Sequence, residues 1–202
     1  YGADTLRTYE MFIGAFDLSA SWSEDGVKGC RRFLERVWKL QDILTDDEGY
    51  SADMETKMHQ TIKKVSSDFE SLKYNTAIAA MMSLINDFYK KNAVTKGEYK
   101  TLITLLNPVA PHITEELWAE YGHTDSVFHT QWPAADEEAM KDDEIEIPVQ
   151  INGKTKVIIS ISAEATKEEA IEAGKAAVAD KLTGNIIKEI YVPKKIINIV
   201  AK

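Results

Sequence analysis

The feature that most constrains this chain is a change of hydrophobic period near residue 145. Up to about Tyr121, apolar residues recur every three or four positions, as on one face of an amphipathic helix. From Glu146 they alternate with polar residues, as in half-buried strands. One element type cannot satisfy both periods, so the sequence predicts a helical domain over residues 1–122 and a small α+β domain over residues 145–202.

Helix signals divide the first domain into five segments, or six if a proline break is counted. Ser23, Ser51 and Asn75 stand where N-caps are expected, because their side chains can accept a bond from a free N–H of the first turn. Short connections between such helices predict an antiparallel bundle. The expected helices cover residues 4–16, 23–44, 51–72, 75–91, 95–106 and 107–122.

Two signals in the second half of this domain are more specific. Thr95 is followed three residues later by Glu98, which predicts a capping box. Pro108 must interrupt the next helical pattern, because proline lacks the N–H that a helix interior requires. Asn107 is expected to cap the helix where it resumes.

The second domain begins with a hairpin signal. Asn152-Gly153 separates two β-rich runs, and a type I′ turn needs positive φ at both central residues. Pro148 predicts that the first strand lies at an edge of the sheet. Thr166 and Glu169 form a second expected capping box, before a helix to about residue 182. Strands over residues 186–192 and 196–200 complete a ββαββ order.

Charge is unevenly distributed between these parts. The net charge of −9 would disfavour a nucleic-acid partner if it were spread evenly. Residues 1–122 carry 14 Lys and Arg against 19 Asp and Glu, residues 123–144 carry 1 against 7, and residues 145–202 carry 9 against 7. Clustered like charges repel, so residues 123–144 are expected to form an acidic linker.

Composition excludes several classes of protein. The single cysteine, Cys30, permits no internal disulfide and is expected to be a small buried residue. No apolar run is long enough to cross a bilayer and no secretory signal pattern is present, so a cytoplasmic protein is expected. Because the chain starts at Tyr1 without Met, it reads as a fragment of a larger protein.

Motifs along the whole chain resemble the C-terminal part of bacterial-type leucyl-tRNA synthetase, a class I enzyme. The Thr114-to-Trp118 segment is also similar to segments of the valyl and isoleucyl enzymes, whereas the combination is typical of the leucyl family. The matching motifs are Tyr1-Gly2-Ala3-Asp4-Thr5-Leu6-Arg7, Glu10-Met11-Phe12, Arg32-Phe33-Leu34-Glu35-Arg36-Val37-Trp38, Asn107-Pro108-Val109-Ala110-Pro111-His112-Ile113-Thr114-Glu115-Glu116-Leu117-Trp118, Trp132-Pro133, Val149-Gln150-Ile151-Asn152-Gly153-Lys154 and Tyr191-Val192-Pro193.

The resemblance implies a helical bundle of the class I anticodon-binding type that holds the body of tRNA(Leu), followed by a mobile domain that reaches the corner of the tRNA. It implies that the parent enzyme is an ATP- and magnesium-dependent leucine-tRNA ligase with catalytic and editing domains in cis. The family's two nucleotide-binding signatures are absent from this sequence. No catalytic residue, cofactor or metal is therefore expected in this fragment.

Two groups of cations are candidate tRNA contacts. On the second helix, Lys28, Arg32, Arg36 and Lys39 recur at helical spacing, although such a stripe is equally typical of a solvated face with pairs such as Glu35–Lys39. In the second domain, two lysines are expected on one face of a strand and two in a loop, forming one cluster. The candidate tRNA-binding residues are Lys154, Lys156, Lys194, Lys195, Arg32, Arg36 and Lys39.

Two of these positions depart from the family pattern, in which many relatives have Arg at position 156 and Gly at position 194. Lys156 keeps the charge but lacks the fork geometry of Arg. The second domain also lacks aromatic residues that look exposed, so contacts to shape and backbone are expected rather than sequence reading.

Two other functions remain as alternatives. His112 with Glu115 has a spacing found in di-iron bundles, but a second such motif and further carboxylates are missing. A helical scaffold could instead bind a protein through a groove lined by Met54, Met58, Met81 and Met82, although methionine at helical spacing more often fills a core. The salt dependence of RNA binding would discriminate between RNA and protein partners.

Overall fold

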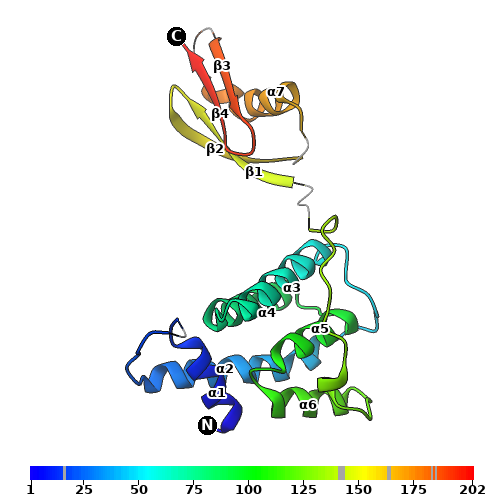
Figure 1. Ribbon diagram of the computed structural model, residues 1–202. Coiled ribbons are helices and arrows are strands. Elements are labelled where there is room, and N and C mark those ends of the chain that lie inside the picture. The colour runs from blue at the N-terminus through cyan, green and yellow to red at the C-terminus, as the bar shows by residue number, and fades with distance from the viewer. Residues whose placement is uncertain (16, 141–143, 163–164, 183, 185) are drawn as a thin grey trace. The chain divides into compact units, whose positions relative to one another are not determined.

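The computed structural model describes residues 1–15, 17–140, 144–162, 165–182, 184 and 186–202 (Figure 1). The chain divides into two compact units, Tyr1–Met140 and Lys141–Lys202. Each unit has a hydrophobic core of its own, built from residues of that unit alone.

The first unit contains six α-helices in its described residues, the number predicted when the proline break is counted. Ser23 caps the second helix, where its hydroxyl accepts a bond from the Gly26 N–H at 3.2 Å. The Thr95–Glu98 capping box is present in full. The helices are α1 (Ala3–Phe12), α2 (Glu24–Lys39), α3 (Glu55–Glu70), α4 (Tyr74–Lys91), α5 (Lys96–Leu106) and α6 (Pro111–Glu120).

Some helix starts differ from the prediction. Helix α3 begins only at Glu55, because Ser51 makes a turn in which its carbonyl accepts bonds from the N–H groups of Met54 and Glu55. Helix α4 begins at Tyr74, so Asn75 lies within the first turn instead of capping it. Asn107 does not cap α6; its side-chain amide donates to the Thr114 hydroxyl at 2.9 Å.

The core of this unit is formed by the apolar stripes of its helices. Met54, Met58 and Met81 are buried in this core, so they cannot line an exposed groove. Each fully buried side chain of this size stabilises the fold by roughly 1.5–3 kcal/mol. Other fully buried members include Leu40, Ile62, Ile78, Leu84, Ile85, Phe88, Leu102 and Leu105.

The expected acidic linker is largely part of this unit. Val127 is buried, and the Trp132 indole donates to the Ser66 hydroxyl at 2.7 Å. Lys63 pairs with Glu137 at 2.9 Å, and this bond lowers the pKa of the Glu137 carboxyl. Bonds to groups of α3 therefore offset the charge repulsion that predicted a free linker, while residues 141–143 lie outside the described residues.

The second unit is a four-stranded sheet with one helix on one face. Strands β1 (Glu144–Ile151) and β2 (Lys154–Ser162) are antiparallel, as are β3 (Ile186–Val192) and β4 (Ile196–Ala201). The sheet order is β2-β1-β4-β3, with β1 and β4 parallel. Helix α7 (Lys167–Ala177) covers the face that carries the core, which is made of Ile147, Val149, Ile151, Ile161, Ala170, Val178, Ile197 and Ile199.

The hairpin turn forms as predicted, but the strand before it is not at an edge. Asn152 and Gly153 have φ of 50° and 79°, as a type I′ turn requires. Pro148 lies in β1, which is a central strand of the sheet. Proline is tolerated there because the parallel ladder between β1 and β4 starts only at Val149, so no bond to β4 requires the N–H that Pro148 lacks.

Candidate nucleic-acid interface

Helix α2 presents fewer free cations than its sequence predicts. Lys28 lies 3.5 Å from Glu24 and 3.7 Å from Asp25, so its charge is shared with its own helix. Glu35 pairs with Arg31 at 2.8 Å and not with Lys39. Local pairs of this kind leave little net positive charge on the first two turns.

Arg36 contributes to packing as well as to charge. Its guanidinium carbon lies 4.7 Å from the centre of the Tyr89 ring, and the Tyr89 hydroxyl donates to the Arg36 carbonyl at 2.8 Å. Burial raises the pKa of the Tyr89 hydroxyl, and the nearby guanidinium opposes this rise. Among the described residues, only Arg32 and Lys39 of the predicted stripe are exposed and in no ion pair or ring contact.

The four candidate lysines of the second unit are all exposed, and no ion pair joins any of them to another described residue. However, the β1–β2 ladder is irregular at Lys156, which has no partner in β1. A register shift between Val149 and Gln150 makes Lys154 the partner of Ile151 and Val157 the partner of Val149. Directly paired residues project to the same side, so Lys154 lies on the side of Val157, which faces the core together with Ile159 and Ile161.

The four lysines form two pairs rather than one cluster. Lys154 is the partner of Ile151, which is in turn the partner of Ile199 in β4. Lys195 precedes Ile199 by four residues, which is about 13 Å along a strand. Lys154 and Lys156 therefore follow one hairpin turn, and Lys194 and Lys195 occupy the other.

Lys194 has an unusual backbone. Its φ is 57°, in the left-handed region that costs a residue with a Cβ roughly 1–2 kcal/mol. The turn is closed by the Lys195 N–H, which donates to the Val192 carbonyl at 3.0 Å. Glycine would adopt this conformation without strain, so the lysine charge stands at a position that favours glycine.

His112 pairs with a carboxylate of another helix. Its Nδ1 lies 2.8 Å from Asp4, while Glu115 accepts a bond from the Ser126 hydroxyl at 2.6 Å and one from the Val127 N–H. No group of three His, Cys, Asp or Glu side chains suited to a metal ion occurs within the residues that the structure describes.

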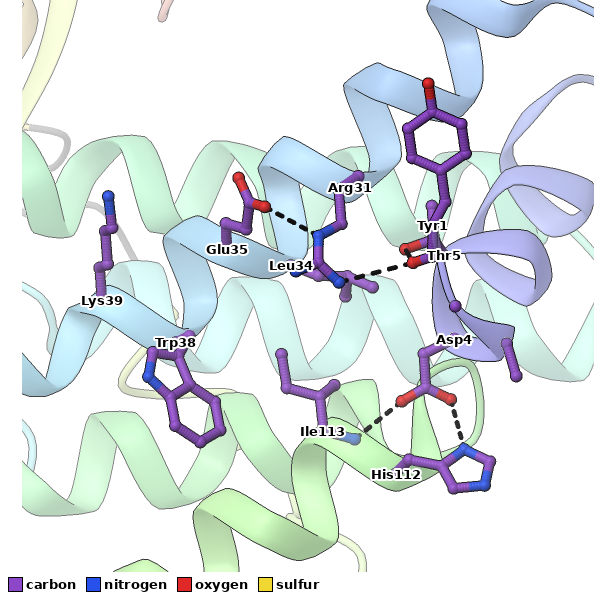
Figure 2. A pocket seen from close by; sticks show the side chains of 12 residues that line it. Tyr1, Asp4, Thr5, Arg31, Leu34, Glu35, Trp38, Lys39, His112 and Ile113 are labelled. Atoms are coloured by element: carbon purple, nitrogen blue, oxygen red, sulfur yellow. Dashed lines mark hydrogen bonds and ion pairs between the residues drawn. The ribbon is translucent and has the colours of Figure 1, made fainter.

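Asp4 is the residue that sequence reasoning missed. It is buried in α1, and its carboxylate accepts a bond from the Ile113 N–H at 2.7 Å, in the first turn of α6 (Figure 2). Helix α6 has no side-chain cap of its own, so Asp4 supplies the cap and a favourable charge at the positive end of the helix. No local sequence pattern predicts this bond, because 109 positions separate Asp4 from Ile113.

Replacing Asp4 with alanine is expected to lower the free energy of unfolding by about 1–2 kcal/mol, the usual cost of a lost cap. Asp4→Asn should cost less, because an amide oxygen can still accept the Ile113 N–H. Urea denaturation followed by tryptophan fluorescence measures both. Asp25→Ala is the control, since the Asp25 side chain is exposed in the first turn of α2; equal effects at both positions would contradict the assignment.

The aromatic residues divide into anchors and exposed side chains. Trp118 is buried and stacks on His123 with ring centres 3.8 Å apart. Trp22 is 65% exposed and Phe128 is 77% exposed. His129 is exposed. In the part of the chain that is described, no helix is both long and apolar enough to cross a membrane.

Comparisons with known proteins point in one direction. The sequence model of the family described as the anticodon-binding domain of tRNA ligase matches residues 52–171. All of the chain aligns at 55% identity, over 208 residues, with the leucine–tRNA ligase of Alkaliphilus oremlandii (strain OhILAs). The structure is similar to a chain from the ternary LeuRS–tRNA–LeuAMS complex of Agrobacterium radiobacter K84 agnB2. The match has a TM-score of 0.75 and 31% sequence identity and covers 98% of this chain. The chain covers 26% of the first protein and 28% of the second.

Proposed function

We propose a tRNA-positioning function from one premise: this chain belongs to the family of anticodon-binding domains of tRNA ligases. The observation that carries the proposal furthest is the alignment of the entire chain, at 55% identity, with a leucine ligase. The partner that follows is tRNA(Leu). We further propose that the helical unit is an antiparallel bundle of the class I type and that the ββαββ unit is its C-terminal domain.

In this proposal the chain contributes binding and orientation only. Catalytic and editing domains elsewhere in a longer ligase, with ATP and magnesium, would activate leucine and transfer it to the tRNA in the cytoplasm. The helical unit would hold the tRNA body with Arg32 and Lys39, and with the outer edge of the Arg36 guanidinium. The lysine pairs at the two hairpins of the second unit would contact phosphates at the corner of the tRNA, where shape matters more than base sequence.

A protein-binding scaffold is the second candidate, but the methionines that suggested it are mostly buried. Met82 alone of the four is half-buried, and it packs against the core. The charge map also favours RNA, because the two hairpins of the second unit carry exposed lysines without an ion pair to any described residue.

The proposal predicts saturable binding of the 202-residue chain to tRNA(Leu). Fluorescence anisotropy of labelled tRNA should rise with protein concentration, and the affinity should fall steeply as salt is added, because phosphate contacts release counterions. The same preparation should show no leucine-dependent ATP–pyrophosphate exchange. Absence of binding at low salt, together with capture of a protein partner, would favour the scaffold instead.

A further inference from the structure

The turn between β1 and β2 is bonded to β4 through both the main chain and the side chain of one residue. The backbone N–H of Asn152 donates to the Ile199 carbonyl at 3.0 Å. The Asn152 side-chain oxygen accepts the Ala201 N–H at 3.0 Å, and the side-chain nitrogen donates to the Ala201 carbonyl at 3.0 Å. A single turn residue therefore makes three hydrogen bonds to β4.

The side-chain bonds extend the parallel ladder between β1 and β4 by one step. The last backbone pair in that ladder is Ile151 with Ile199. In a regular parallel ladder, the next acceptor for the Ala201 N–H would be the main-chain carbonyl of Asn152. The chain turns at Asn152, with a φ of 50°, and the side-chain amide replaces that carbonyl. Asparagine suits this position because it tolerates positive φ and carries both a donor and an acceptor.

A second asparagine holds the other central residue of the turn. The Gly153 N–H donates to the side-chain oxygen of Asn198, in β4, at 3.1 Å. By contrast, the bond that closes the β3–β4 turn is local, from the Lys195 N–H to the Val192 carbonyl. Both central residues of the β1–β2 turn are thus anchored to a central strand of the sheet.

We propose that Asn152 is a positioning residue for tRNA binding, which fixes the direction in which the hairpin presents Lys154 and Lys156. This inference rests on the proposed function, in which these two lysines contact phosphates. Only Gly153 separates Lys154 from Asn152, and Lys156 has no partner of its own in the described ladder between β1 and β2. A hairpin that is already held by β4 loses less conformational entropy when its lysines meet the RNA.

Titrations of labelled tRNA(Leu) with the 202-residue chain test the proposal through a double-mutant cycle. Asn152→Gly removes the side-chain bonds but keeps the net charge and the tolerance of positive φ. It should weaken binding roughly two- to tenfold, the cost of ordering one or two long side chains. With Lys154→Gln and Lys156→Gln already present, it should cause no further loss, because Asn152 acts through those lysines. With Lys194→Gln and Lys195→Gln present instead, it should cause the full loss.

Amide hydrogen exchange, followed by NMR, checks that the fold is kept. In Asn152→Gly the Ala201 amide should exchange faster, because it has lost its acceptor, while the amides of Val149 and Ile197 stay protected. Asn198→Ala is a second variant, which frees the Gly153 N–H and leaves the Asn152 bonds in place. It should weaken tRNA binding in the same background-dependent way, and it decides the matter if Asn152→Gly unfolds the second unit.

Two results would overturn the inference while leaving the proposed function intact. One is unchanged tRNA affinity in Asn152→Gly, although Lys154→Gln with Lys156→Gln weakens binding. The other is an equal loss in both lysine backgrounds, which would mean that Asn152 supports the whole unit rather than this hairpin. Failure of the unaltered chain to bind tRNA would overturn the proposed function as well, and it is recognised before any variant is made.

Discussion

Neutralising Lys154, Lys156, Lys194 and Lys195 together is expected to weaken tRNA binding more than any other surface change. Each lost phosphate contact should reduce the slope of log affinity against log salt by roughly 0.7–0.9, so the four changes should reduce it by about 3. The loss of affinity should therefore be greatest at low salt. Anisotropy titrations of labelled tRNA(Leu) at several salt concentrations measure both quantities.

The matched variant neutralises Arg32 and Lys39 on α2. Arg36 is left in place, because its stacking on Tyr89 would confuse loss of packing with loss of charge. Lys194→Gly adds a control for folding, since it removes one charge while relieving the positive φ. If the four-lysine variant keeps its affinity and salt slope while the α2 variant loses both, tRNA contacts the helical unit and the assignment to the hairpins is wrong.

Replacing Glu98 with alanine is expected to cost about 3–5 kcal/mol of stability in the helical unit, because several buried donors would lose their acceptor at about 1–3 kcal/mol for each group. Glu98 is fully buried, and its carboxylate accepts the N–H of Thr95 at 2.8 Å and the N–H of Ser51 at 3.0 Å. It also accepts the Ser51 hydroxyl.

Tryptophan fluorescence during urea denaturation isolates this effect, because all four tryptophans lie in the first unit. Glu169→Ala is the chemical control: Glu169 makes the same capping box with Thr166, but on an exposed surface of the second unit. Circular dichroism should show a cost there of only about 0.5–1 kcal/mol. Similar costs at both positions would mean that burial of Glu98 adds nothing to its cap.

Features coded by neighbouring residues could be predicted from the sequence. The capping boxes at Thr95 and Thr166 form because their partners lie three residues away, within one helical turn. The Asn152-Gly153 turn forms because both residues tolerate positive φ. The alternating pattern also located the last two strands, whose predicted bounds of 186–192 and 196–200 agree with β3 and β4 to within one residue.

Features that depend on distant partners could not be predicted from the sequence. Asp4 caps α6 across 109 positions, so local pattern favoured Asn107. Pro148 is tolerated in a central strand because β4 pairs with β1 only from Val149 onward. The bulge that leaves Lys156 without a partner is a property of the β1–β2 ladder and has no local signature in β2.

The availability of the candidate tRNA-binding cations could not be predicted from the sequence either. The cations themselves are evident in the sequence, but their availability depends on which carboxylate each one meets. Glu35 has cations four residues away on both sides, Arg31 and Lys39. The structure pairs it with Arg31, which leaves Lys39 free among the described residues. The role of Arg36 in packing depends on Tyr89, which lies 53 positions away.

The most direct test of the tRNA-positioning function compares three RNAs in one titration series: tRNA(Leu), tRNA(Leu) with a replaced anticodon, and a linear RNA of the same length and composition. A chain that holds the folded body of the tRNA should bind the first two with equal affinity and the linear RNA more weakly. Equal affinity for all three RNAs, or loss of affinity when only the anticodon changes, would contradict the proposed function.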